Sequence, residues 1–187
     1  RERHIFQVSS SAVMIVKMRI TILLACVACA TLYAQNNLTT AAVQRYFNPI
    51  RRNLEASAEV MPAEKYGFRL TDGQRTFAEW INHSSERNYR DCSTLKSEPA
   101  PEALKRVPSL KDKAEVMAVL KDSLVYCAAA LEKMDDQKAG SSPEMSVAFL
   151  HVIVHNNEIY GNLVGYLRAS GIVPPSTAGM TSQGKTK

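Results

Sequence analysis

Several features are scarce or absent in this 187-residue sequence, and each absence excludes a class of protein. No apolar run reaches the roughly 20 residues that a membrane-spanning helix needs, so no stable membrane span is expected in the mature chain. Internal repeats, long low-complexity tracts and sustained strand-like alternation of apolar and polar residues are also missing. The length suffices for one domain with a sizeable core, and the patterning favours helices.

Clustered positive charge is scarce as well. The net charge is +5, but residues 1–34 hold four of the 23 basic residues and one of the 18 acidic residues. Without that segment the balance is only +2. A nucleic-acid-binding surface needs basic residues gathered on one face of the folded part, and beyond Arg51-Arg52 the sequence shows only scattered lysines. No nucleic-acid partner is expected.

The N-terminal segment has the pattern of a secretory signal peptide. Met18-Arg19 precedes the short apolar run ITILLACVACA, and small residues and then polar residues follow. Met14 or Met18 is the expected start, and cleavage is expected after Ala34 or Ala30. Residues 1–34 are therefore assigned to the leader and signal peptide, which the mature protein lacks. The prediction is an exported protein, periplasmic or extracellular. The segment LLAC at residues 23–26 also resembles a lipoprotein attachment site, but it leaves a very short apolar region, so ordinary cleavage is favoured.

Cysteines are few. Two of the four lie in the leader, and Cys92 and Cys127 remain on different predicted helices. In an oxidising compartment these two could pair, but the sequence cannot show how far apart they lie. The alternative, two small buried residues, is slightly favoured.

Four segments have the three-four spacing of apolar residues that is typical of core-facing helices. The predicted helices run over residues 40–61, 71–94, 109–135 and 142–169. Pro49 is expected to kink or restart the first helix, and Thr71 or Asp72 to cap the second. Gly171 is expected to end the fourth. The fold class is therefore all-α, a four-helix bundle over residues 35–176, with a small, polar tail at 177–187 that is expected to be disordered.

Two histidines stand out in the last predicted helix, where residues 149–163 read FLHVIVHNNEIYGNL. His151 and His155 are four residues apart, so they lie one turn apart on the same side of a helix. The apolar residues around them form a stripe, which predicts that both rings face the core or a cleft in it: Val147, Leu150, Val154, Ile159, Leu163 and Tyr166. A divalent metal would satisfy both imidazoles at once. The competing interpretation is that each ring is an ordinary surface or satisfied core residue.

A third histidine completes the candidate site. Beyond the leader the sequence keeps only His83, His151 and His155, and three protein ligands with one open position are typical of catalytic zinc sites. Glu158 shares the side of the two helical histidines. It is a candidate fourth ligand, an acceptor for an imidazole N–H, a general base, or simply a solvated carboxylate. Tyr160 is a candidate polar group of the cleft, although helical tyrosines more often serve packing. The pattern is not the H-E-x-x-H protease motif.

Several motifs together resemble the DinB-like (DinB/YfiT) superfamily, especially its exported bacterial branch. They are MPAEKYGFR at 61–69, FAEWINH at 77–83, HVIVHNNEIYGNL at 151–163, YLR at 166–168 and GIVPPS at 171–176. The resemblance covers about residues 40–176. Leu70 departs from the proline expected before the second helix, which should change how that helix begins but not the site.

The resemblance implies a four-helix bundle in up-down-down-up order, with a long crossover between helices 2 and 3. It also implies a divalent metal, such as zinc, nickel or manganese, on three histidines, carried here onto His83, His151 and His155. Relatives include thiol-dependent transferases and isomerases and some metal-dependent hydrolases, and related bundles often pair as homodimers. Export argues against a thiol-transferase role, because low-molecular-weight thiols are mainly cytoplasmic.

Two functions follow as hypotheses. The first is a metal-dependent enzyme with an open position that activates water or a thiol on an unknown small substrate, in which Glu158 or Tyr160 moves a proton. The second is a non-catalytic exported protein whose histidines sequester metal or stiffen the fold.

Overall fold

The structure, a computed structural model, describes residues 14, 17–21 and 37–178. The predicted cleavage sites, the LLAC segment and residues 179–187 of the predicted tail lie outside this part. Residues 14 and 17–21 are helical and belong to a first unit, Arg1–Leu38, and the second unit is Thr39–Lys187.

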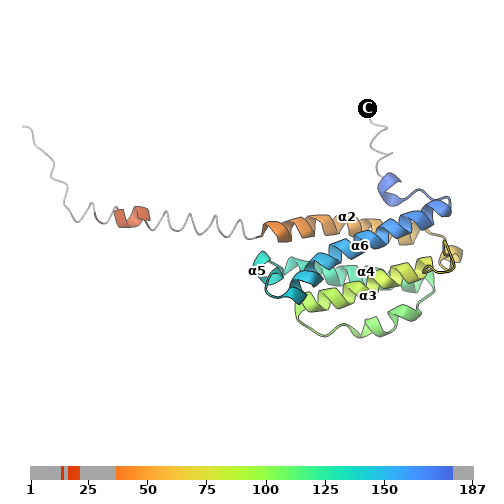
Figure 1. The fold of residues 1–187 in the computed structure, drawn as a ribbon, viewed down its shortest axis with the longest axis horizontal. Coiled ribbons are helices and arrows are strands. Elements are labelled where there is room, and N and C mark those ends of the chain that lie inside the picture. Colours follow the sequence, from red (N-terminus) through yellow and green to blue (C-terminus); the bar gives the residue numbers. More distant parts are fainter. Residues whose placement is uncertain (1–13, 15–16, 22–36, 179–187) are drawn as a thin grey trace, which may run out of the picture. The chain divides into compact units, whose positions relative to one another are not determined.

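The described part of this unit is all-helical, as predicted, and contains no strand. Figure 1 shows its four long helices side by side. In chain order the elements are α2 (Leu38–Val60), η1 (Ala63–Lys65), α3 (Phe77–Lys96), η2 (Glu102–Lys105), η3 (Val107–Ser109), α4 (Lys113–Glu132), α5 (Asp136–Ala139) and α6 (Pro143–Ala169). Helix α3 packs along both α4 and α6, and side chains from all four long helices share one apolar core.

Helix α2 continues through Pro49 as one helix, so the restart expected there does not occur. Its apolar residues Val43, Phe47, Ile50 and Leu54, spaced three or four apart, are all buried. The N-terminal end of α2 is capped by the side chain of a residue far away in the sequence. The carboxylate of Asp136 accepts hydrogen bonds from the backbone N–H of Thr39 (3.1 Å), the backbone N–H of Thr40 (2.7 Å) and the hydroxyl of Thr40 (2.6 Å).

Helix α3 begins at Phe77, later than the predicted start at Thr71 or Asp72. The cap is Thr76, whose hydroxyl accepts a hydrogen bond from the N–H of Glu79 (3.2 Å). The Glu79 carboxylate in turn accepts one from the N–H of Thr76 (2.6 Å). This reciprocal capping box satisfies two backbone donors at the start of the helix. Residues 69–75 form a loop, and most of its residues line a pocket.

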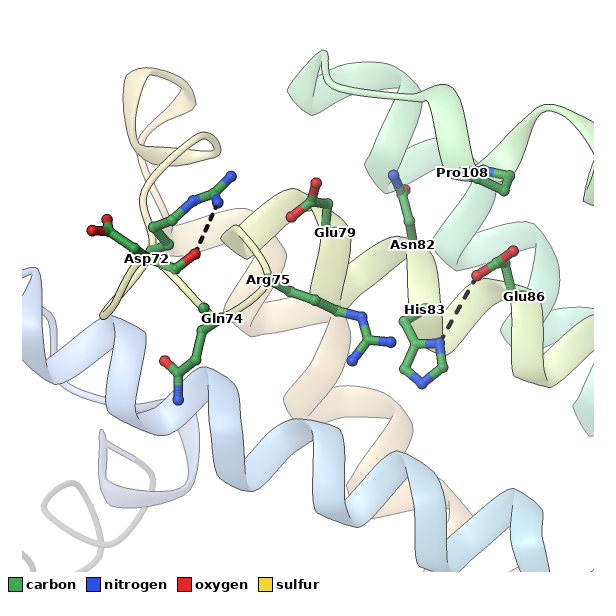
Figure 2. Close-up of a pocket in the computed structure, with 10 residues that line it drawn as sticks. Asp72, Gln74, Arg75, Glu79, Asn82, His83, Glu86 and Pro108 are labelled. Carbon is green, nitrogen blue, oxygen red and sulfur yellow. Dashed lines mark hydrogen bonds and ion pairs between the residues drawn. The ribbon is translucent and has the colours of Figure 1, made fainter.

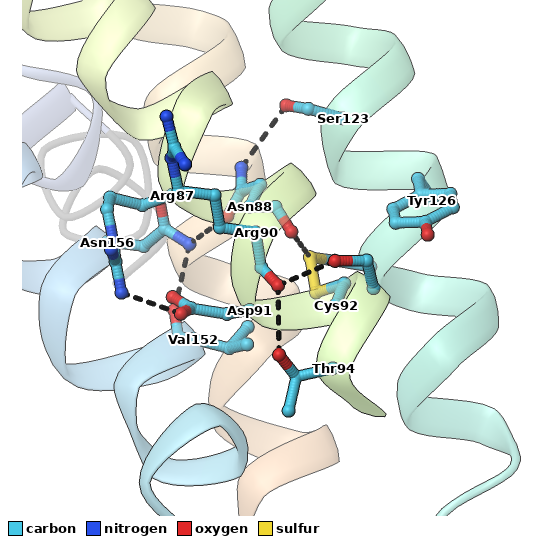
Figure 3. Close-up of a disulfide and its surroundings, with 12 residues drawn as sticks. Arg87, Asn88, Arg90, Asp91, Cys92, Thr94, Ser123, Tyr126, Val152 and Asn156 are labelled. Atoms are coloured by element: carbon cyan, nitrogen blue, oxygen red, sulfur yellow. Dashed lines mark hydrogen bonds and ion pairs between the residues drawn. A yellow bond between two sulfur atoms is a disulfide. The ribbon is translucent and has the colours of Figure 1, made fainter. Parts of the chain in front are cut away.

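Helix α4 is also shorter than predicted, because Asp112 caps it and it ends at Glu132. A disulfide joins Cys127 of this helix to Cys92 of α3, with 5.2 Å between the Cα atoms (Figure 3). The interpretation of these cysteines as two unpaired buried residues is therefore wrong. Both side chains are buried, as that interpretation required, but they meet across the helix interface.

Helix α6 has the predicted bounds: Ser142 caps it, Pro143 begins it, and Gly171 follows its end with a positive φ of 76°. The predicted core stripe is wrong in the first half. Val147, Leu150 and Val154 are exposed, and the buried positions there are Ala148, Phe149, Val152 and Asn156. The predicted C-terminal half of the stripe, Ile159, Leu163 and Tyr166, is buried. Residues 147–154 are apolar on nearly every side, so their spacing does not identify the buried face.

Beyond α6, residues 175–178 form a further helical turn, which includes Thr177 and Ala178 of the tail predicted to be disordered. Within the described part of the chain, no helix is both long enough and apolar enough to cross a membrane.

Candidate functional site

The structure brings the three predicted histidines together between α3 and α6. The Nε2 atoms of His83 and His155 lie 3.1 Å apart, and the two rings meet edge to face with centroids 4.8 Å apart. The ring of His151 stacks on that of His155, with centroids 4.6 Å apart and an angle of 14° between the planes. Because the buried face of α6 differs from the predicted one, the rings lie at the margin of the core rather than inside it. His151 keeps 30 % of its side-chain exposure and His155 keeps 14 %.

Each histidine has a carboxylate near its Nδ1 atom. The distances from Nδ1 are 2.7 Å to Asp91 for His151, 3.3 Å to Glu158 for His155 and 3.9 Å to Glu86 for His83. The Asp91 contact is a strong hydrogen bond to a buried carboxylate, the Glu158 contact is weak, and the Glu86 contact is only electrostatic. A carboxylate on Nδ1 favours the tautomer that has its proton there, and so leaves Nε2 as a lone-pair donor.

Asp91 is the best-held of these carboxylates. Its second oxygen accepts a hydrogen bond from Nη2 of Arg87 at 2.7 Å, and the same Nη2 lies 3.4 Å from Nδ1 of His151. Figure 3 shows Arg87 and Asp91 on the turn of α3 that leads into the disulfide. Sequence reasoning missed Asp91. The signal that could have found it is its spacing of four residues from Arg87, which is typical of an ion pair along one helix face.

A buried polar chain lies directly behind the histidines. The Ser84 hydroxyl donates to Oδ1 of Asn156 (2.6 Å), Nδ2 of Asn156 donates to Oδ1 of Asn88 (2.6 Å), and Nδ2 of Asn88 donates to the Ser123 hydroxyl (3.2 Å). All four side chains are buried, so their bonds are shielded from water. Since Ser84 and Asn156 each follow a histidine in sequence, these bonds hold α3 and α6 in the register that places His83 against His155.

The surroundings lower the pKa of two of the imidazoles. Burial, followed by the positive charge of Arg75, lowers the pKa of His83 from 6.5 to about 4. Burial, followed by the neighbouring His151, also lowers the pKa of His155 below its ordinary value. A neutral ring can offer a lone pair to a metal or to a proton, whereas an imidazolium cannot.

The donor set fits a divalent metal by its chemistry. The Nε2 atoms of His83 and His155 are 3.1 Å apart, so one divalent ion would be held by both rings, with neutral imidazole nitrogen as the donor. In the part of the chain that the structure describes, however, no group of three or more His, Cys, Asp or Glu side chains is arranged so that it could hold a metal ion.

The two predicted proton carriers differ. Glu158 lies at the site but is 64 % exposed, as a solvated carboxylate would be. Tyr160 is buried, and its hydroxyl donates to the Ser176 hydroxyl (2.7 Å) and accepts from the Ser176 N–H (3.1 Å). The Tyr160 hydroxyl therefore fastens the segment after α6, and we assign it no role at the histidines.

A pocket of about 410 Å³ opens beside His83 (Figure 2). Its lining comes from the loop before α3, the first turns of α3 and Pro108: Arg69, Asp72, Gly73, Gln74, Arg75, Glu79, Asn82, His83, Glu86 and Pro108. Its volume lies within the range of ordinary small-molecule sites. The histidine cluster therefore has an adjoining space that a substrate could occupy.

Comparisons of the chain with protein-family models, with curated proteins and with solved structures found no match in any of the three.

Proposed function

We propose that the chain is a metal-dependent enzyme of the DinB-like type that acts on a small molecule bound beside His83. The observation that carries the proposal is the meeting of His83 and His155 at 3.1 Å between their Nε2 atoms, with carboxylates near the Nδ1 atoms of all three histidine rings. Imidazoles whose other nitrogen faces a carboxylate are typical of metal ligands.

In this proposal His83, His151 and His155 hold a divalent ion, which is zinc, nickel or manganese. The ion would supply a Lewis acid, or lower the pKa of a water or thiol bound to it toward 7. Asp91 fixes the ring of His151, and the Asn156 chain fixes the register of the two helices. Glu158, exposed at the edge of the site, is the group in position to take up a proton and pass it to solvent.

The fold and the compartment belong to the same proposal. We infer a four-helix bundle in up-down-down-up order, in which the connection of residues 97–112 between α3 and α4 is the long crossover. We also infer export to an oxidising compartment. The Cys92–Cys127 disulfide supports it, because disulfides persist in such compartments and are rare in the cytosol.

Calorimetric titration of the metal-free protein with zinc, nickel and manganese tests the proposal. We expect one ion to bind per chain, and we expect His155→Ala to abolish binding. Asn157→Ala, an exposed position on the same helix, should leave binding unchanged. Azide or a small thiol added to the loaded protein should then bind at an open position. A wild-type protein that binds none of the three metals would refute the proposal, and a loaded protein closed to azide and thiols would leave only a structural metal.

A further inference from the structure

Arg75 is held beside the histidines by two aromatic residues. Its guanidinium carbon lies 4.9 Å from the centre of the Trp80 ring, and the Trp80 ring centre lies 6.3 Å from that of His83. The Tyr166 hydroxyl donates to the backbone carbonyl of Arg75, and Trp80 Nε1 donates to the Tyr166 oxygen at 3.2 Å. Both ends of Arg75 are thus positioned, and Figure 2 shows its side chain reaching along α3 toward His83.

The positive charge of Arg75 has no ion-pair partner among the residues that the structure describes. The acidic groups of the same pocket are engaged or distant. Glu79 accepts the hydrogen bond that caps α3, and Glu86 faces Nδ1 of His83 at 3.9 Å. An exposed guanidinium stacked on an aromatic ring keeps its N–H groups free for a planar acceptor, which a carboxylate supplies with two oxygens.

The charge of the pocket limits how anionic that ligand can be. Two arginines, Arg69 and Arg75, face three carboxylates, Asp72, Glu79 and Glu86. The three acidic groups repel a phosphate dianion more strongly than a single carboxylate, which carries one negative charge and pairs that charge with Arg75. The volume of about 410 Å³ leaves room for a neutral body beyond the carboxylate.

We propose that Arg75 anchors the substrate by binding the carboxylate of a small monocarboxylic compound whose other end lies at His83. The inference rests on the proposed function only in making this ligand the substrate. Binding at Arg75 itself requires no metal.

The chain contains a single tryptophan, Trp80, so its fluorescence reports directly on this pocket. N-acetylglycine is the probe, and its neutral amide, N-acetylglycinamide, is the matched control at equal ionic strength. We expect a saturable fluorescence change with N-acetylglycine on the wild type and none with the amide. Arg75→Gln should weaken binding about tenfold or more, because a hydrogen-bonded charge pair is lost. Arg75→Lys should fall in between, since it keeps the charge but not the planar donor pair.

Arg52→Gln makes the same charge change on an exposed position of α2 and should bind like the wild type. Arg75 is itself exposed, so the variants should fold, and circular dichroism checks this. The inference is overturned if N-acetylglycine gives no saturable change, if Arg75→Gln binds as tightly as the wild type, or if inorganic phosphate binds more tightly than the carboxylate.

Nickel titration in the same cuvette separates the two proposals. Nickel at the histidines should quench Trp80, whose ring lies 6.3 Å from His83. If nickel quenches Trp80 but N-acetylglycine does not bind, only the inference about Arg75 is overturned. If N-acetylglycine binds but nickel neither quenches Trp80 nor is taken up, only the metal proposal is overturned.

Discussion

Removing the Cys92–Cys127 disulfide is predicted to lower the free energy of unfolding by several kcal/mol. The bond connects residues 35 apart in sequence and joins α3 to α4 at a Cα–Cα distance of 5.2 Å. In the chain-entropy account, closing a loop of that length in the unfolded chain removes about 12.7 cal/mol/K, or about 3.8 kcal/mol at 25 °C. Both cysteine side chains are fully buried, so the disulfide bond is shielded from solvent in the folded protein.

Urea denaturation followed by circular dichroism measures the effect. The wild type in its oxidised form is compared with Cys92→Ala/Cys127→Ala and with the wild type after reduction in denaturant and refolding. The reduced wild type keeps both sulfur atoms, so it separates the cross-link from the lost side-chain volume. We expect the double alanine variant and the reduced wild type to unfold at a lower urea concentration than the oxidised wild type. Their thermal midpoints should fall by about 8–15 °C for a chain of this size.

Equal unfolding midpoints and equal urea dependence for the oxidised and reduced wild type would refute this reasoning. The two sulfur atoms would then contribute only packing.

Three further predictions concern single residues. Asp91→Asn replaces an acceptor at Nδ1 of His151 by an amide that can donate, so it should weaken metal affinity about 10–100-fold in calorimetry; unchanged affinity in a folded variant would contradict the role of Asp91. Asn156→Leu leaves the Ser84 hydroxyl and Oδ1 of Asn88 without their partner and should cost about 1–3 kcal/mol for each in urea denaturation; an unshifted midpoint would show that the polar chain relaxes freely. The Thr40 hydroxyl and nearby N–H groups lower the pKa of Asp136 below its ordinary 3.8, so its stabilisation is complete above that pH and is lost as the pH falls through the lower folded value. The difference in thermal midpoint between the wild type and Asp136→Asn should therefore shrink in acid, and a difference that does not depend on pH would argue against the cap.

The helices were predictable where one signal dominated. The bounds of α6 follow from Ser142 and Pro143 at its start and from Gly171 after its end. The start of α3 was not predictable from local preference, because Thr71, Asp72 and Thr76 are all good caps. Thr71 and Thr76 are each followed three residues later by a Gln or Glu that completes a capping-box pattern. Predicting the Cys92–Cys127 pairing requires knowing how α3 and α4 lie relative to each other, and the spacing of residues along the sequence does not give that placement.

The site was predictable in its histidines but not in their surroundings. Three histidines in the folded part are few enough to suggest one shared site, and the structure does bring them together. The buried face of α6 was misjudged because Asn156, a polar residue, occupies a core position that an apolar stripe does not predict. Asp91 was missed for a related reason, since an acidic residue in a helix is ordinarily read as solvent-facing. Both are buried only because partners on another element satisfy them.

Anomalous diffraction from crystals loaded with nickel or zinc tests the central claim most directly. The account predicts one metal peak per chain, about 2.0–2.2 Å from the Nε2 atoms of His83, His151 and His155, with the ring of His151 turned out of its parallel stack on His155. A loaded crystal with no peak at this cluster, or with the ion held by other residues, would contradict it.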